Sequence, residues 1–203
     1  MLKNELNVVF LDCTLRDGGY YNSWDFSKVL IDEYLEAMEA AGVNVVELGL
    51  RSLKNKGFQG ACAFTTDEFI QSLEIPKSLT VGVMVNGSEL VCNLPQAEVL
   101  ERLFPNDAES SSVDLVRIAC HVHEFEKALP AVTWLKERGY RVGFNLMQVA
   151  DRTEEEVKAL ARMAKAYPMD ALYFADSMGS MNPDHTAQII QWFRSEWKGA
   201  MGI

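Results

Sequence analysis

A short run of charged residues and glycines, residues 16–20 (RDGGY), follows the first apolar segment of the chain. An arginine in this position can face a developing anion, and the Asp17 carboxylate beside it can hold a divalent cation. Two glycines in succession would allow the backbone to turn closely around a ligand. The run therefore predicts either a reactive site or a structural ion pair.

The apolar segment before this run predicts a strand on which Asp12, Thr14 and Arg16 share one face, because side chains alternate along a strand. A carboxylate inside a buried parallel strand costs several kcal/mol unless it is paired or bound to a metal. Asp12 and Arg16 could thus pair with each other to close the fold. We expect residues 16–20 to form a polar loop after the strand.

Polar residues recur near the ends of the later apolar segments. A single buried polar residue is usually a satisfied core residue, but recurrence at equivalent positions is poorly explained by structure alone. We therefore treat these positions as candidate site residues. They are Glu47 and Arg51, Asn86, Arg117, His121 and His123, Asn145 and Gln148, and Asp176, Ser177 and Ser180.

The histidines have a spacing that could suit a metal, but alternate residues share a face only while a strand continues, and the strand is ending there. Three interpretations stay open: metal ligation, a substrate contact by His121, and loop or capping roles for both His121 and His123. His185 follows Pro183 in the first turn of a predicted helix and is expected at the surface.

Seven apolar segments rich in β-branched residues alternate with helical patterns. Their near-continuous hydrophobicity predicts strands covered on both faces, and the alternation with helices predicts parallel pairing through right-handed crossovers. The segments begin near Asn7, Val43, Leu79, Val113, Tyr140, Asp170 and Ala200.

Helix boundaries are marked by capping residues. The first predicted helix covers residues 27–41 and ends before Gly42. Residues 153–156 form a capping box, and Asn182 with Pro183 marks another helix start. We expect the inner face of the first helix to carry Val29, Leu30, Leu35 and Met38.

Strand and helix alternation fits an open doubly wound sheet or an eight-fold barrel. The first unit favours the barrel, because the first strand is not followed by GxGxxG running into a helix. The predicted fold class is α/β, a (β/α)8 TIM barrel that is incomplete in this chain, with residues 1–203 as one domain. Six units and the start of strand seven are present, whereas a complete barrel needs about 250 residues.

The chain carries 19 Lys and Arg residues against 29 Asp and Glu residues, a net charge of −10, which disfavours nucleic acid and anionic membranes as partners. There is no apolar run of membrane-spanning length and no signal-peptide core at the start, so we expect a cytoplasmic protein. The four cysteines are far apart and are expected to be reduced thiols, mostly in the core. They are Cys13, Cys62, Cys92 and Cys120.

The segment LDCTLRDGGYYNSWDF resembles the start of the DRE-TIM metallolyases. These aldolase and pyruvate-carboxyltransferase-like barrels include 4-hydroxy-2-oxovalerate aldolase, HMG-CoA lyase, and the isopropylmalate, homocitrate and citramalate synthases. Supporting stretches are VVELGLRS, VDLVRIACHVHE, VGFNLMQVADRT and YFADSMGSMNP, so the resemblance covers nearly the whole chain. The last of these and the segment after His121 favour the hydroxy-oxoacid aldolase branch.

The resemblance implies a role for several residues. Asp17 matches a carboxylate ligand of a divalent metal, Arg16 the arginine that stabilises an enolate, Glu47 the signature glutamate, and Ser177 a residue that binds the oxoacid carboxylate. The candidates for substrate binding are Glu47, Arg117, His121 and Ser177.

Tyr20 departs from the family, which more often has glutamine or histidine there. The histidine serves as the catalytic base in the aldolases, and a phenol is a poor base at neutral pH unless a cation lies near it. Tyr20 is the catalytic candidate at this position. Oxygen ligands favour Mn²⁺ or Mg²⁺ over Zn²⁺ or Co²⁺ as the cofactor. The family's remaining metal ligands, a His-x-His pair at the end of strand seven, would lie beyond Ile203.

These expectations define a first hypothesis, a metal-dependent aldolase or lyase that acts on a 4-hydroxy-2-oxoacid through a pyruvate-type enolate. An acyl-CoA-dependent synthase of the same superfamily and a non-catalytic module that binds an oxoacid or a sugar are the alternatives. The expected partners are a small 2-oxoacid and either further copies of this chain or a further chain that completes the barrel. The 203-residue chain alone is expected to be catalytically silent and to bind metal weakly.

Overall fold

The structure is a computed structural model that describes residues 8–54 and 57–203. Asn7, the predicted start of the first strand, lies outside the described residues. The chain divides into two compact units, residues 1–83 and residues 84–203. Each unit is described by itself below.

Seven strands follow one another in the sheet in chain order, with helices between them. The pairs β1–β2, β4–β5, β5–β6 and β6–β7 are parallel. The strand order confirms the predicted fold class, an α/β chain with the topology of an incomplete (β/α)8 barrel. The strands are β1 (Leu11–Asp12), β2 (Val45–Leu50), β3 (Thr80–Asn86), β4 (Leu115–His121), β5 (Arg141–Met147), β6 (Ala171–Phe174) and β7 (Ala200–Gly202).

Helices separate the strands, and the boundaries of several were predicted from capping residues. No helix in residues 8–54 and 57–203 is long and apolar enough to cross a membrane. Short 3₁₀ turns lie at Ala61–Ala63 and Ala108–Ser110. The α-helices are α1 (Thr14–Asn22), α2 (Lys28–Ala40), α3 (Asp67–Gln71), α4 (Gly87–Leu90), α5 (Gln96–Leu103), α6 (Val122–Ala128), α7 (Pro130–Glu137), α8 (Glu154–Lys165) and α9 (Pro183–Glu196).

The predicted caps are confirmed. The Ser27 hydroxyl accepts the Leu30 N–H at the start of α2, and Gly42, just past that helix, has φ of 74°. The capping box predicted for residues 153–156 starts α8. These features depend on neighbours in the sequence, so they could be predicted from local patterns.

The inner face of α2 was predicted correctly at Leu35 and wrongly in the first turn of the helix. Ile31 and Leu35 are the buried residues of this helix, whereas Val29 is 67% exposed and Leu30 is 47% exposed. Met38 is half-buried. Because α2 starts at Lys28, the spacing i, i+4, i+7 that faces the core begins at Ile31 and leaves the first turn outside.

The chain after β1 also differs from the prediction. β1 ends at Asp12, and residues 14–22 form helix α1 instead of a continued strand and a polar loop. The Asp12 carboxylate accepts the Thr14 N–H at 2.9 Å and the Thr14 hydroxyl at 3.1 Å. A side chain that accepts a free N–H at a helix start ends the strand there, so Thr14 and Arg16 do not share a strand face with Asp12.

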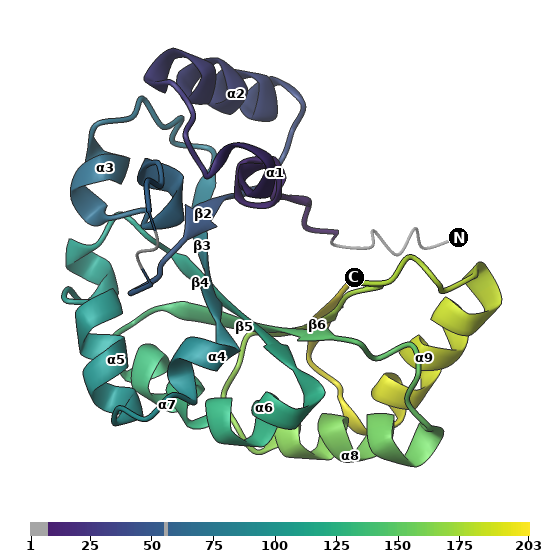
Figure 1. Cartoon of the computed structure of the whole chain (residues 1–203). Coiled ribbons are helices and arrows are strands. Elements are labelled where there is room, and N and C mark those ends of the chain that lie inside the picture. Colours follow the sequence, from purple (N-terminus) through teal and green to yellow (C-terminus); the bar gives the residue numbers. More distant parts are fainter. Residues whose placement is uncertain (1–7, 55–56) are drawn as a thin grey trace. The chain divides into compact units, whose positions relative to one another are not determined.

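In the second unit, one face of the strands is apolar and is covered by helices (Figure 1). Phe144 of β5 contacts Phe125 of α6, with ring centroids 5.2 Å apart, and Phe174 of β6 stacks on Phe193 of α9 at 5.6 Å. Alternation places the residues one position away on the opposite face. That opposite face carries Arg117, Asn145 and Tyr173.

The four cysteines, which all belong to the described part of the chain, form no disulfide, and two of them, Cys62 and Cys120, are buried. Burial raises the pKa of the Cys62 thiol to about 12 and raises that of Cys120 above its usual range. Cys13 is half-buried and Cys92 is exposed, so fewer of the cysteines lie in the core than predicted.

Exposure and pKa predict an order of thiol reactivity. A disulfide reagent at neutral pH should modify Cys92 quickly, and Cys62 and Cys120 only as the chain unfolds, because the thiolate is the nucleophile. Mass spectrometry of the modified peptides over time would check this order. Modification of Cys62 in the folded protein as fast as that of Cys92 would contradict it.

Candidate active site

In the first unit, Arg16 lies in the first turn of α1 between two carboxylates. Its Nε donates to Glu47 Oε1 of β2 at 2.8 Å, and its Nη1 donates to Asp17 Oδ1 at 2.8 Å. The Arg16 side chain is 12% exposed and that of Glu47 is 0% exposed, whereas that of Asp17 is 68% exposed. A buried carboxylate thus orients the guanidinium, and a solvent-facing one extends beside it.

The electrostatics keep Arg16 permanently charged. Burial by itself lowers the pKa of a guanidinium, but the Glu47 carboxylate, through its charge and its hydrogen bond, outweighs burial and raises the Arg16 pKa above its usual range. A fixed, oriented cation of this kind can stabilise an anion that forms next to it.

Trp24 holds this helix in place, and sequence reasoning missed it. Its indole Nε1 donates to the Arg16 carbonyl oxygen at 2.9 Å. A Cβ on Gly19 would lie 2.0 Å from Trp24 Cδ1, so this position must be glycine for the indole to pack. Gly19 therefore serves packing, and the expected close turn around a ligand is not what it provides. The sequence signal for this contact was the position of Gly19 five residues before Trp24.

Tyr20 is adjacent to this indole. The two rings meet edge to face with centroids 4.7 Å apart, and Tyr20 is 61% exposed. Trp24 itself has φ of 57° and follows Ser23 with φ of 59°, a left-handed pair that is costly for residues other than glycine. The end of α1 is thus a strained turn that presents Tyr20 to solvent.

Asp12 is structural in this unit and does not pair with Arg16 as one interpretation expected. The Tyr34 hydroxyl of α2 donates to Asp12 Oδ1 at 2.6 Å. Burial, followed by this hydrogen bond, raises the pKa of Tyr34 above its usual range. Asp12 therefore joins the end of β1 to both α1 and α2.

Arg51 likewise has a structural environment. Its Nη2 lies 2.7 Å from Asp67 Oδ1, and its Nε donates to the Thr65 carbonyl oxygen at 3.1 Å. Arg51 is 3% exposed and Asp67 is 7% exposed. This buried ion pair connects the end of β2 to α3.

In the second unit, the ends of β4, β5 and β6 are joined by hydrogen bonds. His121 ends β4, and its Nδ1 lies 3.1 Å from Gln148 Oε1, just after β5. The Gln148 N–H donates to Ser177 Oγ at 3.2 Å, after β6. The structure thus brings together His121 and Ser177, which were predicted separately, through a residue of the third strand end.

Arg117 lies on the face of the strands opposite α6 and α9. Its guanidinium carbon is 4.5 Å from the centroid of the Tyr173 ring, and Arg117 is 7% exposed. Gly143 lies between them, because a Cβ there would be 2.8 Å from Tyr173 Cε2 and 3.5 Å from Arg117 Cγ. Arg117 pairs with Gly143 in the sheet, and Asn145 is two positions further along the same face. The result is a largely buried contact between a cation and an aromatic ring on this face of the three strands.

The loop after β6 is held by Asp176. Its carboxylate accepts the N–H groups of Ser180 and Met181, each at 2.9 Å. The Met181 and Ser180 hydrogen bonds lower the pKa of Asp176 below its usual value, since they favour the charged form. Asp176 therefore acts on the loop that contains Ser177, and Ser180 takes part through its backbone.

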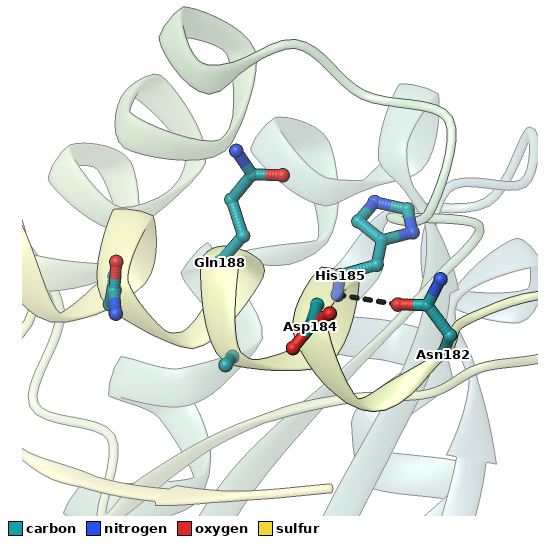
Figure 2. Close-up of a pocket in the computed structure, with 6 residues that line it drawn as sticks. Asn182, Asp184, His185 and Gln188 are labelled. Atoms are coloured by element: carbon teal, nitrogen blue, oxygen red, sulfur yellow. Dashed lines mark hydrogen bonds between the residues drawn. The ribbon is translucent and has the colours of Figure 1, made fainter.

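His123 and His185 occupy different environments. His123 is exposed, and its ring stacks on that of His121 with centroids 5.5 Å apart and planes 10° apart. His185 is half-buried in the first turn of α9, and its N–H donates to Asn182 Oδ1. His185 is one of the residues that line a pocket of about 520 Å³ along α9. Figure 2 shows the side chains that line it. Its lining residues are Asn182, Asp184, His185, Ala187, Gln188 and Gln191.

A metal could find one suitable oxygen donor in the first unit. The Asp17 carboxylate is exposed, and Oδ1 is held by Arg16. Among residues 8–54 and 57–203, no group of three or more histidine, cysteine, aspartate or glutamate side chains is arranged to hold a metal ion. Asp17 thus fits a hard cation in chemical type and supplies a single ligand.

Comparisons with known proteins show which proteins the chain is similar to. No protein-family model matches the chain. It is 25% identical over 193 residues to "4-hydroxy-2-oxovalerate aldolase 4" of Rhodococcus opacus, a match that covers 92% of this chain and 52% of that protein. A crystal structure of the N-terminal domain of a proposed aldolase from Bacteroides vulgatus matches with a TM-score of 0.78 and 26% identity, over 96% of this chain and 63% of that one.

The chain is similar in sequence to proteins of the DRE-TIM superfamily, which confirms the resemblance predicted from its motifs. It also shares its fold with the hydroxymethylglutaryl-CoA lyase of Pseudomonas aeruginosa, with a TM-score of 0.67 and 15% identity over 93% of this chain and 64% of that one. The chain spans about half the length of the curated relatives it matches.

Proposed function

We propose that the full-length protein is a metal-dependent carbon–carbon lyase that cleaves a 4-hydroxy-2-oxoacid through the enolate of pyruvate. The observation that carries the proposal is the Arg16 guanidinium, fixed by the buried Glu47 and flanked by the exposed Asp17. The names of the relatives, 4-hydroxy-2-oxovalerate aldolases among them, support the same reaction class.

Arg16 would stabilise the enolate oxygen as the carbon–carbon bond breaks. Its charge is held in place before the reaction, so stabilising the anion requires little reorganisation. Glu47 was predicted to contact the substrate, but its side chain is 0% exposed. In this proposal Glu47 acts through Arg16 and is a positioning residue.

The second unit has its own candidates for contacts with an oxoacid. Arg117 offers a cation next to an aromatic ring, His121 an imidazole, and Ser177 a hydroxyl. Tyr20 is assigned to the site as an exposed phenol beside Trp24. Each of these side chains lies in or directly after a strand, or in the helix that follows β1.

A divalent metal, Mn²⁺ or Mg²⁺ by its preference for oxygen, would supply Lewis acidity toward the 2-oxo and carboxylate oxygens. Asp17 is the residue of this chain that would hold it, and the remaining ligands would come from other parts of the full-length protein. Asp17 would also keep Arg16 from turning away, through the bond between Nη1 and Oδ1.

Asp17→Asn should sharply lower the affinity for Mn²⁺ in the full-length protein, because it removes the ligand charge and keeps the shape of the side chain. Calorimetric titration with Mn²⁺ alone measures the affinity. Asp151→Asn, at an exposed position after β5, is the matched control and should leave the affinity unchanged. Wild-type affinity and stoichiometry in Asp17→Asn would remove Asp17 from the metal site.

The reaction itself is tested by following pyruvate from 4-hydroxy-2-oxoacids with a lactate dehydrogenase coupled assay. Pyruvate release that depends on added metal and needs no CoA supports the proposal. Turnover that requires an acyl-CoA would favour the synthase alternative, and oxoacid binding without turnover would favour the non-catalytic module.

A further inference from the structure

Gln148 is the residue through which the ends of β4, β5 and β6 are connected, and nothing above assigns it a role. We propose that Gln148 is a positioning residue that fixes the His121 imidazole in the tautomer with Nδ1 protonated, leaving Nε2 as the proton acceptor for a substrate hydroxyl. The role of His121 as a base rests on the proposed function. The tautomer rests only on the geometry of the second unit.

The tautomer follows from the partner of the ring. Gln148 presents Oε1 to His121 Nδ1 at 3.1 Å, and a carbonyl oxygen can only accept. With the amide in this orientation, Nδ1 carries the proton when the imidazole is neutral, and the lone pair is on Nε2. Histidine side chains in water favour the opposite tautomer, so the contact with Gln148 changes which nitrogen can act as a base.

The ring is also held by its own segment. The Glu124 carboxylate accepts the His121 N–H at 2.9 Å and fixes the backbone where β4 becomes α6. The His123 ring lies parallel to that of His121. In the sheet, His121 pairs with Met147, the residue before Gln148, so strand register brings the imidazole and the amide together.

Gln148 uses its backbone as well as its side chain. Its N–H donates to Ser177 Oγ at 3.2 Å, and its carbonyl oxygen accepts from Arg152 Nε at 3.4 Å. Its φ is 60°, a left-handed conformation that glycine adopts more readily. An exposed residue kept in a strained conformation while its side chain orients a histidine is typical of functional sites.

The chemical step is the cleavage of the 4-hydroxy-2-oxoacid. His121 Nε2 takes the proton of the 4-hydroxyl as the bond between C3 and C4 breaks, and the electron pair of that bond forms the enolate of pyruvate. The aldehyde leaves, and the protonated imidazole returns its proton to C3. No oxidant or reductant is needed, and His121 ends as it began. This assigns the base to His121 instead of the Tyr20 phenol.

The tautomer is tested on the 203-residue chain without any activity. The chain has three histidines, so ¹⁵N-resolved NMR of the imidazoles at a pH where they are neutral gives three separable patterns. His121 should show protonated Nδ1 in the wild type. Gln148→Leu should shift it toward protonated Nε2, and Gln148→Glu, which keeps an acceptor, should retain protonated Nδ1. Gln188→Leu, at an exposed position on α9, is the matched control.

Kinetics of the full-length protein test the role of His121 as the base and the role of Gln148 in positioning it. His121→Asn should lower kcat by about 10²-fold or more, within the usual range for a general base. Gln148→Leu should lower kcat with little change in KM, and Gln148→Glu should restore much of the loss. Circular dichroism identifies a variant that fails to fold. If Gln148→Leu fails to fold, Ser177→Ala removes the hydroxyl that accepts the Gln148 N–H. This variant should lower the population of the His121 tautomer with Nδ1 protonated.

The outcomes are distinct. A wild-type His121 protonated at Nε2, or a Gln148→Leu variant with an unchanged tautomer, would overturn the role of Gln148 whatever the reaction is. Pyruvate release at the wild-type rate in His121→Asn would overturn the assignment of the base. Absence of pyruvate release from the wild-type protein, with the expected tautomer present, would contradict the proposed function and leave the positioning by Gln148 established.

Discussion

Arg16→Ala is expected to lower kcat for pyruvate release from a 4-hydroxy-2-oxoacid by about 10²-fold or more in the full-length protein, with a smaller change in KM. In the proposed reaction the guanidinium, oriented by Glu47 at 2.8 Å, would face charge that develops only as the bond breaks. Steady-state kinetics with the lactate dehydrogenase coupled assay measure both constants.

Two further variants sharpen this test. Arg16→Lys should not restore the rate. Arginine contacts Glu47 through Nε and Asp17 through Nη1, whereas the lysine ammonium is a single point charge and cannot make both contacts in this geometry. Arg141→Ala removes an exposed arginine from the start of β5 and serves as the matched control. A loss confined to KM would mean that Arg16 only binds the substrate, and a lysine variant of near wild-type rate would refute the two-point contact.

Asp67→Ala is expected to lower the free energy of unfolding by about 3–5 kcal/mol, because it removes a carboxylate that compensates the Arg51 charge in a buried environment. The 2.7 Å contact is between side chains that are 3% and 7% exposed, so solvent cannot replace the lost carboxylate. Urea unfolding, followed by circular dichroism at neutral pH, measures the change.

The control for this prediction is an exposed ion pair. Arg162 contacts Glu155, whose side chain is 80% exposed, and Glu155→Ala should cost less than about 1 kcal/mol. The double replacement of Arg51 by Met and Asp67 by Leu should recover part of the stability that Asp67→Ala loses, since a buried apolar pair needs no charge compensation. Equal losses in Asp67→Ala and Glu155→Ala would contradict the structural role of the buried pair.

The parts of the fold that could be predicted depend on residues close in the sequence. The caps at Ser27, Thr153 and Asn182 use hydrogen bonds that reach no more than three residues along the chain. The continuous apolar segments predicted buried parallel strands, because an apolar run along a strand indicates that both of its faces are covered. The first turn of α2 was predicted on the wrong face. The apolar pattern does not say which side of the helix packs on the core, because this depends on the position of the other elements.

The candidate site shows where this reasoning stops. The sequence singled out Arg16, Asp17 and Glu47 by type and by their place in or after apolar segments, and the structure joins them into one cluster. It did not indicate that Arg16 pairs with Glu47 instead of Asp12. The Asp12 carboxylate accepts the first N–H of α1, and Arg16 lies in a helix turn and not on a strand face.

Residue types, their order and the caps were thus determined by the sequence alone, since they follow from local hydrogen bonding and from the period of the apolar pattern. Tertiary structure decided which side chains meet. Register between β4 and β5 brings His121 to Gln148, 27 residues away, and the packing of an indole on Gly19 connects Trp24 to Arg16. Contacts of this kind depend on how separate elements pack. Local sequence patterns therefore do not indicate which distant residue a side chain will contact.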